Sequence, residues 1–390
     1  MELKHGIHLG YCTNIHRGET WAETWQNLKT HTMQVRDRVC SSERYGIGLR
    51  LGEQAARELS DPAQLDSFRQ WLEDENCYVF TINGFPYGQF HGTRVKEQVY
   101  RPDWTTQERL DYTNHLFDIL SAILPEGIPG SVSTLPGSFK EFGIDEGGLK
   151  LIMNNLESCR RHIEKLSENT GHELHLGLEP EPLGLFETSG ESVKFFALML
   201  DHLGGDTSFL KTVGINYDTC HLAVEFEEAV DALEKIRSHG IRLSKIHLSS
   251  ALSLKPTPTA LARLGDFTED TYLHQVVIRS GQDLPLQRFR DLPDALEFAG
   301  KQPGPLGDEW RVHFHVPIHA QPEMVFGDTR DHIEDTVAWL KANPTACQHL
   351  EMETYTWEVL PENLRAGSVV DQLENEYDWC LGALRGADLA

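Results

Sequence analysis

The sequence predicts an α/β protein built as a (β/α)8 TIM barrel, with a long insertion after the seventh strand. Strand-like segments alternate with helix-like segments along all 390 residues, which is typical of repeated βα units around a parallel sheet. Several strand-like segments in the second half end abruptly in carboxylate or imidazole side chains, as expected at the C-terminal rim of such a barrel. No linker rich in Gly, Ser or Pro divides the chain, so we expect residues 1–390 to form a single domain.

Eight β-rich runs are the predicted barrel strands. They cover residues 6–12, 46–51, 78–84, 131–137, 175–181, 213–219, 243–249 and 349–355. Helices are expected between them. Thr20-x-x-Glu23 and Thr105-x-x-Glu108 resemble capping boxes, the reciprocal side-chain and backbone pairs that begin helices. A final helix over 373–384 would close the ring against the first strand.

The interval between the seventh and eighth strands is too long for one βα unit. His247 and Glu353 lie 106 residues apart, whereas a unit needs about thirty. We therefore expect an insertion over 251–327, with a hairpin and the unusual run RVHFHVPIH at 311–319. Because it follows a strand at the C-terminal face, it should overhang the site as a lid or pocket wall. A helix at 328–342 would resume the barrel.

Composition narrows the class of partner and the compartment. The chain has 35 Lys and Arg against 60 Asp and Glu, a formal net charge of −25, which disfavours a nucleic-acid partner. No apolar stretch is long enough to span a membrane, and the N-terminus does not resemble a secretory signal, so we expect a soluble, cytoplasmic protein. The seven cysteines form no C-x-x-C pair and should be reduced.

Two strand ends carry candidate carboxylates. Glu179 precedes Pro180, which cannot continue a central ladder, so its carboxylate should lie at the rim. The alternative is an ion pair with Lys or Arg inside the barrel mouth. Glu181 shares its side of the strand and either contacts substrate, supports a neighbouring ligand or caps a helix. On the last strand Glu351 and Glu353 share a face, and Glu353 is nearer the rim.

Histidines follow at the next strand ends. Asp218 and His221 form D-x-x-H, a spacing that can share a ligand sphere but also fits an Asp that merely caps a helix. His247, flanked by apolar residues, is either a ligand or a satisfied core histidine. His313 and His315 should share a face by alternation, as a gripping pair or as a solvent-facing cluster on an edge strand. Three carboxylates and an imidazole would suit one divalent cation.

The order Glu, D-x-x-H, His, Glu on strands five to eight resembles the xylose isomerase-like superfamily of TIM barrels. GLEPE, GINYDTCHLA, KIHLSS and LEMETY carry the resemblance over nearly the whole chain. That superfamily includes sugar isomerases, ketose 3-epimerases, inosose dehydratases and nucleases of the endonuclease IV type. The stretches GYCTNIH, NGFPYGQFHG, PDW and ETYTWEVLP further resemble the subgroup called EboE, a metabolite traffic protein.

The resemblance implies a metal site and its surroundings. Glu179, Asp218, His247 and Glu353 would hold one divalent ion, either Mn, Zn, Fe or Co. His221 would lie near substrate hydroxyls. Other substrate-binding candidates are Glu181, Asn83, His313 and His315. The run HFHVP resembles a loop with the sequence G-H-V-P in related proteins, which implies that His315 could also bind a second metal ion. Phe85 and Leu135 stand where nuclease-type relatives have histidines, which argues against a three-zinc site.

The leading hypothesis is therefore a metal-dependent isomerase or epimerase acting on a small polyhydroxylated sugar or cyclitol through a metal-chelated enediolate. Glu179 and Glu353 would move the proton, while His221 and Glu181 hold hydroxyls. A hydride shift or a dehydration could use the same residues. The alternatives are a hydrolase that uses metal-bound water and a non-catalytic metabolite carrier.

Overall fold

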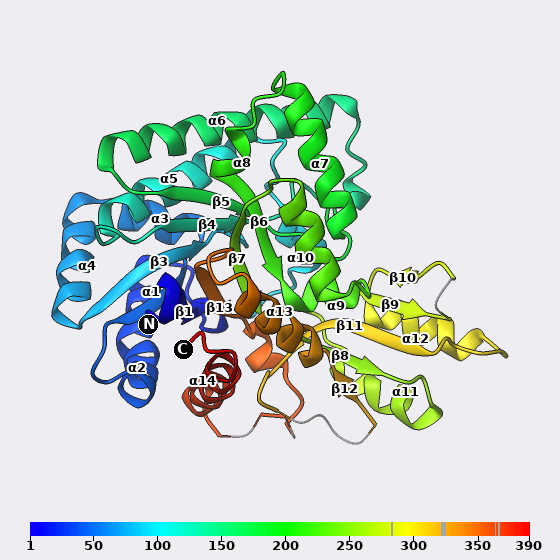
Figure 1. The fold of residues 1–390 in the computed structure, drawn as a ribbon. Helices are drawn as coiled ribbons and strands as arrows, with labels where there is room; N and C mark the ends of the chain where they lie inside the picture. The colour runs from blue at the N-terminus through cyan, green and yellow to red at the C-terminus, as the bar shows by residue number, and fades with distance from the viewer. Residues whose placement is uncertain (282–283, 321–324, 363, 366) are drawn as a thin grey trace.

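The computed structural model describes residues 1–390 except 282–283, 321–324, 363 and 366. Eight parallel strands form a nearly closed barrel with helices between them, which confirms the predicted fold class (Figure 1). Around the sheet their order is β1-β13-β7-β6-β5-β4-β3-β2. The barrel strands are β1 (His8–Tyr11), β2 (Tyr45–Arg50), β3 (Cys77–Asn83), β4 (Gly130–Thr134), β5 (Leu174–Leu178), β6 (Val213–Asp218), β7 (Leu243–Leu248) and β13 (His349–Met352).

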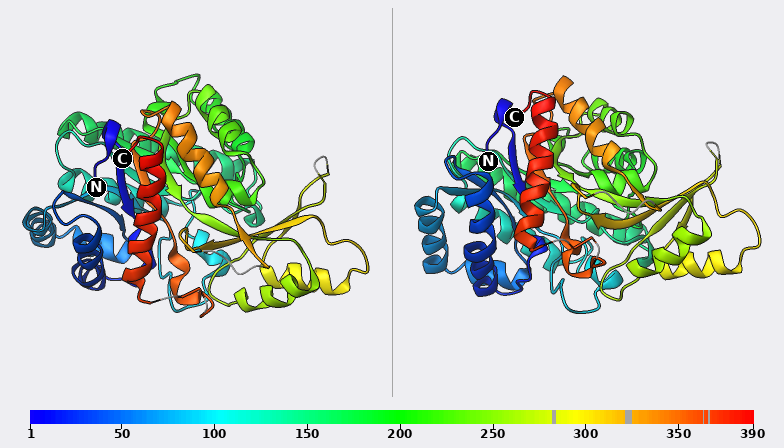
Figure 2. Two further views of the ribbon diagram at one scale, coloured as in Figure 1. Left: turned by 60° about the horizontal axis from the view of Figure 1, so that its bottom comes forward. Right: turned by 90° about the horizontal axis from the view of Figure 1, so that it is seen from below.

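The barrel closes between its first two strands and between its first and last. β1 pairs in parallel with β13 from His8 with His349 to Tyr11 with Met352. A single parallel bridge from Cys12 to Gly48 joins the β1 side to β2. The two chain ends consequently lie side by side, as Figures 1 and 2 show, and the Lys4 amide donates to the Leu389 carbonyl at 3.1 Å.

Helices cover the outside of the barrel. They are α1 (Trp21–Asn27), α2 (Met33–Val39), α3 (Glu53–Leu59), α4 (Pro62–Asp74), α5 (Gln107–Ile123), α6 (Glu146–Thr170), α7 (Ser189–His202), α8 (Phe209–Thr212), α9 (Thr219–Val224), α10 (Ala229–Ser238), α13 (Arg330–Ala342) and α14 (Val369–Gly386). The capping box of Thr20 and Glu23 is present at α1. The second predicted box is wrong: Thr106 caps α5, because the Thr105 hydroxyl donates to Asp103 instead.

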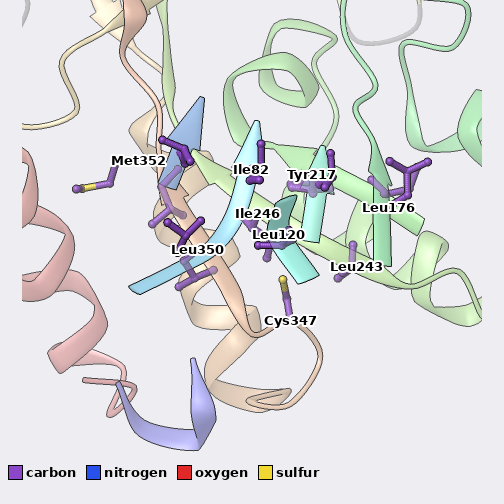
Figure 3. Packing of buried hydrophobic residues seen from close by; sticks show 14 of the residues in the cluster. Ile82, Leu120, Leu176, Tyr217, Leu243, Ile246, Cys347, Leu350 and Met352 are labelled. Carbon is purple, nitrogen blue, oxygen red and sulfur yellow. The ribbon is translucent and has the colours of Figure 1, made fainter. Parts of the chain in front are cut away.

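The hydrophobic core lies between the barrel and its helices. Figure 3 shows Ile82, Leu176 and Ile246, from β3, β5 and β7, among the core side chains with Leu120 of α5. Alternate strand residues are polar and meet across the barrel interior instead. For example, the Ser131 hydroxyl bonds His349 Nδ1 at 2.7 Å, although β4 and β13 are not neighbours. Period-two alternation thus separates an apolar outer layer from a polar interior.

The segment of the chain between β7 and α13 forms a second sheet. Its antiparallel strands, in order β10-β9-β11-β8-β12, are β8 (Ser250–Leu254), β9 (Val276–Arg279), β10 (Gln287–Phe289), β11 (Glu309–Val316) and β12 (Gly327–Asp328), accompanied by α11 (Pro258–Leu264) and α12 (Leu292–Lys301). β9 and β10 form the predicted hairpin. Part of this segment projects beyond the barrel (Figure 2). The description of 251–327 as an insertion within one domain stays a prediction.

None of the described helices is both long and apolar enough to cross a bilayer. All seven cysteines are buried and free of disulfides, which agrees with their scattered spacing.

A candidate metal centre at the barrel mouth

The barrel strands deliver two glutamates directly beyond their last residues. Glu179 follows β5, and its amide donates to the Thr134 carbonyl at 3.0 Å before Pro180 ends the ladder. Glu353 follows β13 with its amide on the Leu248 carbonyl at 3.2 Å. Both side chains are almost fully buried. The last backbone bonds of the strands therefore fix where these carboxylates lie.

Asp218 has two roles at once. Its Oδ1 caps α9, accepting from the amides of Cys220 at 2.7 Å and His221 at 3.1 Å, and also from the Ser249 hydroxyl at 2.6 Å. Its Oδ2 is fully buried and has no hydrogen-bond partner among the described residues. The capping interpretation and the ligand interpretation of D-x-x-H are thus compatible, because each uses a different oxygen.

His247 lies between the carboxylates and is held from behind. In the sheet it pairs with Asp218 on one side and Glu351 on the other. Its Nε2 bonds Glu351 Oε2 at 2.8 Å, and the same carboxylate oxygen accepts from the Lys245 ammonium at 2.7 Å. Its Nδ1 faces the other acids, at 3.1 Å from Glu179 Oε1 and 3.4 Å from both Asp218 Oδ2 and Glu353 Oε2.

Burial alone would lower the pKa of His247, but the negative charges of Glu353 and Glu179 outweigh it and hold that pKa well above its ordinary value. A bound divalent cation would take the place of the His247 proton and neutralise the negative charge of these carboxylates.

Ligand atoms of Glu179, Asp218, His247 and Glu353 all lie within 4.8 Å of one another, each on a buried side chain. Two observations make the group fit a divalent cation. Asp218 Oδ2 is a buried oxygen with no well-formed hydrogen bond among the described residues, its ion-pair contact being His247 Nδ1 at 3.4 Å, and three carboxylates with one imidazole suit Mn, Fe, Co or Zn. Glu351 carries no ligand atom of this group and orients His247, in the way outer partners orient metal-bound imidazoles.

Three further histidines gather beside this group. The His221 ring lies 4.5 Å from the ring of His313 and 5.5 Å from that of His315, between ring centroids. A register shift in the pairing of β11 with β8 falls between Val312 and His315. Both histidines of β11 are buried on a strand between β8 and β9, so the solvent-facing alternative is wrong.

Glu181 lies deep in the same mouth. The Tyr100 hydroxyl donates to its Oε2 at 2.9 Å, and its Oε1 has no partner among the described residues. Burial raises the pKa of Glu181 well above its ordinary value, and the charges of Glu179, Asp218 and Glu353 raise it further.

Asn83, predicted to contact substrate, lies behind Glu353 instead. Its Nδ2 donates to Glu353 Oε1 at 3.1 Å, and it is not among the residues that line the pocket. Asn14, which sequence reasoning missed, donates to the same oxygen at 2.8 Å and does line the pocket. It belongs to the stretch GYCTNIH beyond β1, where its position after a predicted strand was the available signal.

A pocket of about 570 Å³, which includes space open to solvent, lies over these groups. At the barrel end it is lined by Glu179, Glu181, His221 and Glu353, so these candidates share one cavity with His313. Its outer part comes from the segments after β3 and from the second sheet's side, including Tyr272 and Gln275. Tyr272, Leu273, Gln275 and His313, from the segment after β7, are among the lining residues.

No family model matches the chain, and no curated protein matches it in sequence. Solved structures nevertheless share its fold over nearly their whole length. A xylose isomerase-like TIM barrel protein from Mycobacterium smegmatis in complex with magnesium has a TM-score of 0.53 and 12% identity, covering 98% of this chain and 97% of that one. A D-tagatose 3-epimerase-like protein has a TM-score of 0.51 and 11% identity, covering 98% of both.

An L-ribulose 3-epimerase is similar to the same degree, with a TM-score of 0.50 and 12% identity over 99% of this chain and 96% of its own. At such identities the likeness establishes the fold alone. The fold is a TIM barrel, as in these neighbours.

Proposed function

We propose that the protein is a divalent-metal-dependent isomerase or epimerase acting on a small sugar-like or cyclitol-like substrate. The observation that carries the proposal is the convergence of Glu179, Asp218, His247 and Glu353 within 4.8 Å at the floor of a pocket. The fold shared with an L-ribulose 3-epimerase and a D-tagatose 3-epimerase-like protein supports it. The ion is Mn, Zn, Fe or Co by its mixed oxygen and nitrogen donors.

A divalent cation held there would polarise a carbonyl and the adjacent hydroxyl, so that the C–H between them becomes acidic. Glu179 and Glu353 both line the pocket and would remove the proton from one face and return it to the other. Asn14 and Asn83 hold Glu353 Oε1, which fixes its Oε2 toward the cluster. His221, whose Nδ1 bonds the Pro180 carbonyl at 3.1 Å, keeps Nε2 for a substrate hydroxyl.

Deuterium exchange tests the proton transfer without requiring the true substrate. Manganese-loaded protein in D2O, incubated with ketopentoses, ketohexoses and inososes, should place deuterium on the carbon beside the carbonyl, detected by proton NMR. A hydride shift would isomerise without incorporating deuterium, and a dehydration would release an unsaturated product. Absence of all three outcomes across the panel, and also with α-hydroxyketones that carry an alkyl tail, would contradict the proposed class.

Replacing Glu353 by Gln tests the acid–base role directly. The amide keeps the size and one oxygen, so we expect exchange to fall by about a thousandfold in protein whose metal content is checked by elemental analysis. Undiminished exchange with the metal retained would sink the isomerase proposal. Glu168→Gln, on the exposed face of α6, is the matched control and should leave exchange unchanged.

A metal-dependent hydrolase is the second candidate, because another possible ligand group adjoins the first. Ligand atoms of Asp218, His221 and His315 also lie within 4.8 Å of one another, and His315 Nε2 has no partner in the described part of the chain. Two tightly bound ions per chain, rather than one, would favour hydrolysis. A non-catalytic carrier would bind metal and ligand without deuterium exchange. The narrower likeness to EboE suggests this role. That likeness and the cytoplasmic location both stay predictions.

A further inference from the structure

The carboxylates and imidazoles of the pocket lie at the barrel end. Six of the pocket's other lining residues are apolar, namely Phe85, Pro86, Phe90, Val95, Val99 and Leu273. We call these six residues, together with Tyr100, Tyr272 and Tyr355, the outer wall. Phe90, Tyr272 and Tyr355 pack against one another at 4.9 to 5.2 Å between ring centroids. Three segments distant in sequence thus combine into one aromatic and aliphatic surface above the ligand cluster.

The polar groups of Tyr100, Tyr272 and Gln275 near the outer wall are already used within the protein, whereas the Tyr355 hydroxyl makes no hydrogen bond with the described residues. The Tyr272 hydroxyl bonds His91 at 2.8 Å and the Tyr100 hydroxyl donates to Glu181. Gln275 donates to the Pro182 carbonyl at 3.0 Å and accepts from His313 Nδ1 at 2.8 Å. Among the described lining residues, the unpartnered buried atoms lie at the barrel end instead, namely Glu181 Oε1, His313 Nε2 and Asn14 Oδ1.

Charge excludes an anionic tail as well. Lys96 is the only Lys or Arg among the described lining residues, and its ammonium is occupied by the carbonyls of Glu269 and Tyr272, at 3.0 and 2.6 Å, and by Asp291 at 2.7 Å. Glu179, Glu181 and Glu353 face the same cavity. A phosphorylated substrate would therefore meet acids and, in the described part of the lining, no free cation.

A ligand hydroxyl placed against the aliphatic residues and Phe rings of the outer wall, away from the Tyr355 hydroxyl, would lose its water without gaining a partner. Such burial weakens binding roughly 5- to 100-fold for each group. Each methylene covered there strengthens binding by about fourfold. A substrate that is hydroxylated along its whole length fits this cavity poorly.

We propose that the site takes an amphiphilic ligand, with a small head of adjacent carbonyl and hydroxyl oxygens at the barrel end and an apolar substituent covered by the outer wall. The proposal rests on the proposed function for the head alone. An underivatised sugar and a sugar phosphate are both disfavoured.

Hydroxamates test the outer wall, because all of them present the same two chelating oxygens and differ only in the tail. The affinities of acetohydroxamate, butanohydroxamate, hexanohydroxamate and gluconohydroxamate are measured by calorimetry on manganese-loaded protein. We expect about fourfold tighter binding per added methylene, and hexanohydroxamate at least tenfold tighter than gluconohydroxamate, whose tail has the same length but is hydroxylated. A flat series, or gluconohydroxamate binding as tightly as hexanohydroxamate, would overturn the proposal.

Variants test whether the outer wall causes the increase in affinity with hydroxamate chain length. Val99→Asn should abolish the chain-length gain and leave acetohydroxamate affinity unchanged, while Val230→Asn, on the exposed face of α10, should leave both unchanged. Val99→Thr keeps the side-chain shape and replaces the Asn variant if that one does not fold. A chain-length gain that persists in a folded Val99 variant would contradict the assignment.

The two proposals fail separately. The head requires the metal, so acetohydroxamate failing to bind would count against the proposed function. The series is then repeated on metal-free protein by saturation-transfer NMR. Hexanohydroxamate must still give the stronger signal than gluconohydroxamate, and equal signals would overturn the outer-wall proposal alone.

Discussion

Glu351 and Lys245 form a fully buried ion pair directly behind His247. A carboxylate on His247 Nε2 fixes the ring so that Nδ1 faces Glu179, Asp218 and Glu353. Glu351 and Glu353 share a face of the last strand, and the structure gives them different positions: Glu353 lies in the ligand group and Glu351 lies behind the imidazole.

Replacing Glu351 by Gln should weaken manganese binding by about 10- to 100-fold, because the amide no longer fixes the imidazole as a carboxylate does. Calorimetric titration with Mn²⁺ measures the change. The variant also leaves the Lys245 charge buried beside a neutral group, which destabilises the fold. The double variant Glu351→Gln, Lys245→Met should recover the stability of the wild type but not its metal affinity. Recovery of both would mean that Glu351 affects metal binding only by stabilising the fold.

Glu376 on α14 offers a pH-dependent readout away from the ligand group. Burial raises its pKa to about 8, although the neighbouring polar groups of Thr354, Ile318 and Gln372 oppose the shift, the last by donating to its Oε1 at 3.3 Å. In the unfolded chain a glutamate titrates near 4.3. The native state therefore keeps a proton that the unfolded state loses, so this contribution to stability is complete below about pH 4 and is lost as pH rises through about 8.

Glu376→Gln should accordingly remove a slope of roughly 1.4 kcal/mol per pH unit from the free energy of unfolding between about pH 5 and 8. Urea titrations at several pH values measure it. Glu374→Gln on the same helix, whose carboxylate is partly exposed beside Arg38, should keep the wild-type slope. An unchanged slope in the Glu376 variant would show that this carboxyl ionises normally.

At the scale of elements, β2 makes room for the side chains of β13. A Cβ on Gly48 would overlap Glu351 Oε1 and lie 2.7 Å from the Tyr11 carbonyl oxygen. Gly48 also forms the bridge that joins β2 to the β1 side. The absence of a side chain there serves both barrel closure and the position of Glu351.

Gly48→Ala should therefore destabilise the protein by roughly 1–3 kcal/mol through overpacking and also displace Glu351. The visible spectrum of the cobalt-loaded protein should shift, since the imidazole loses its fixed partner. Gly88→Ala is the control, because a methyl group added at Gly88 would meet no described atom within 4 Å. A Gly48 variant with wild-type stability and spectrum would contradict this account of the strand.

At the scale of the whole molecule, one bound ion would join strands from across the barrel and stabilise the native chain. With free metal at 100 times its dissociation constant, the stabilisation is about 2.7 kcal/mol, or about 3 °C in Tm for 390 residues. Calorimetric scans before and after chelation, with elemental analysis, test this and the expected one ion per chain. Asp218→Asn keeps an oxygen to cap α9 but lacks the charge, so its Tm should not respond to metal.

Much of this arrangement could be predicted from sequence. Polar residues stand at or within one position of the last residue of β5, β6, β7 and β13, so the parallel order alone gathers Glu179, Asp218, His247 and Glu353. Contacts between distant loops could not be predicted, because no local pattern specifies them. Tyr100 reaching Glu181 is one case, and Asn83 turning to Glu353 rather than to the cavity is another.

The pairing of β1 with β13 sets the order of assembly during synthesis. Some 340 residues separate the paired strands, so the seam cannot form until nearly the entire polypeptide has left the ribosome. Glu353 emerges with the same last strand. Nascent chains halted before β13 would hold Glu179, Asp218 and His247 without the fourth ligand, and would expose unpaired strand edges, which are targets for chaperones and proteases.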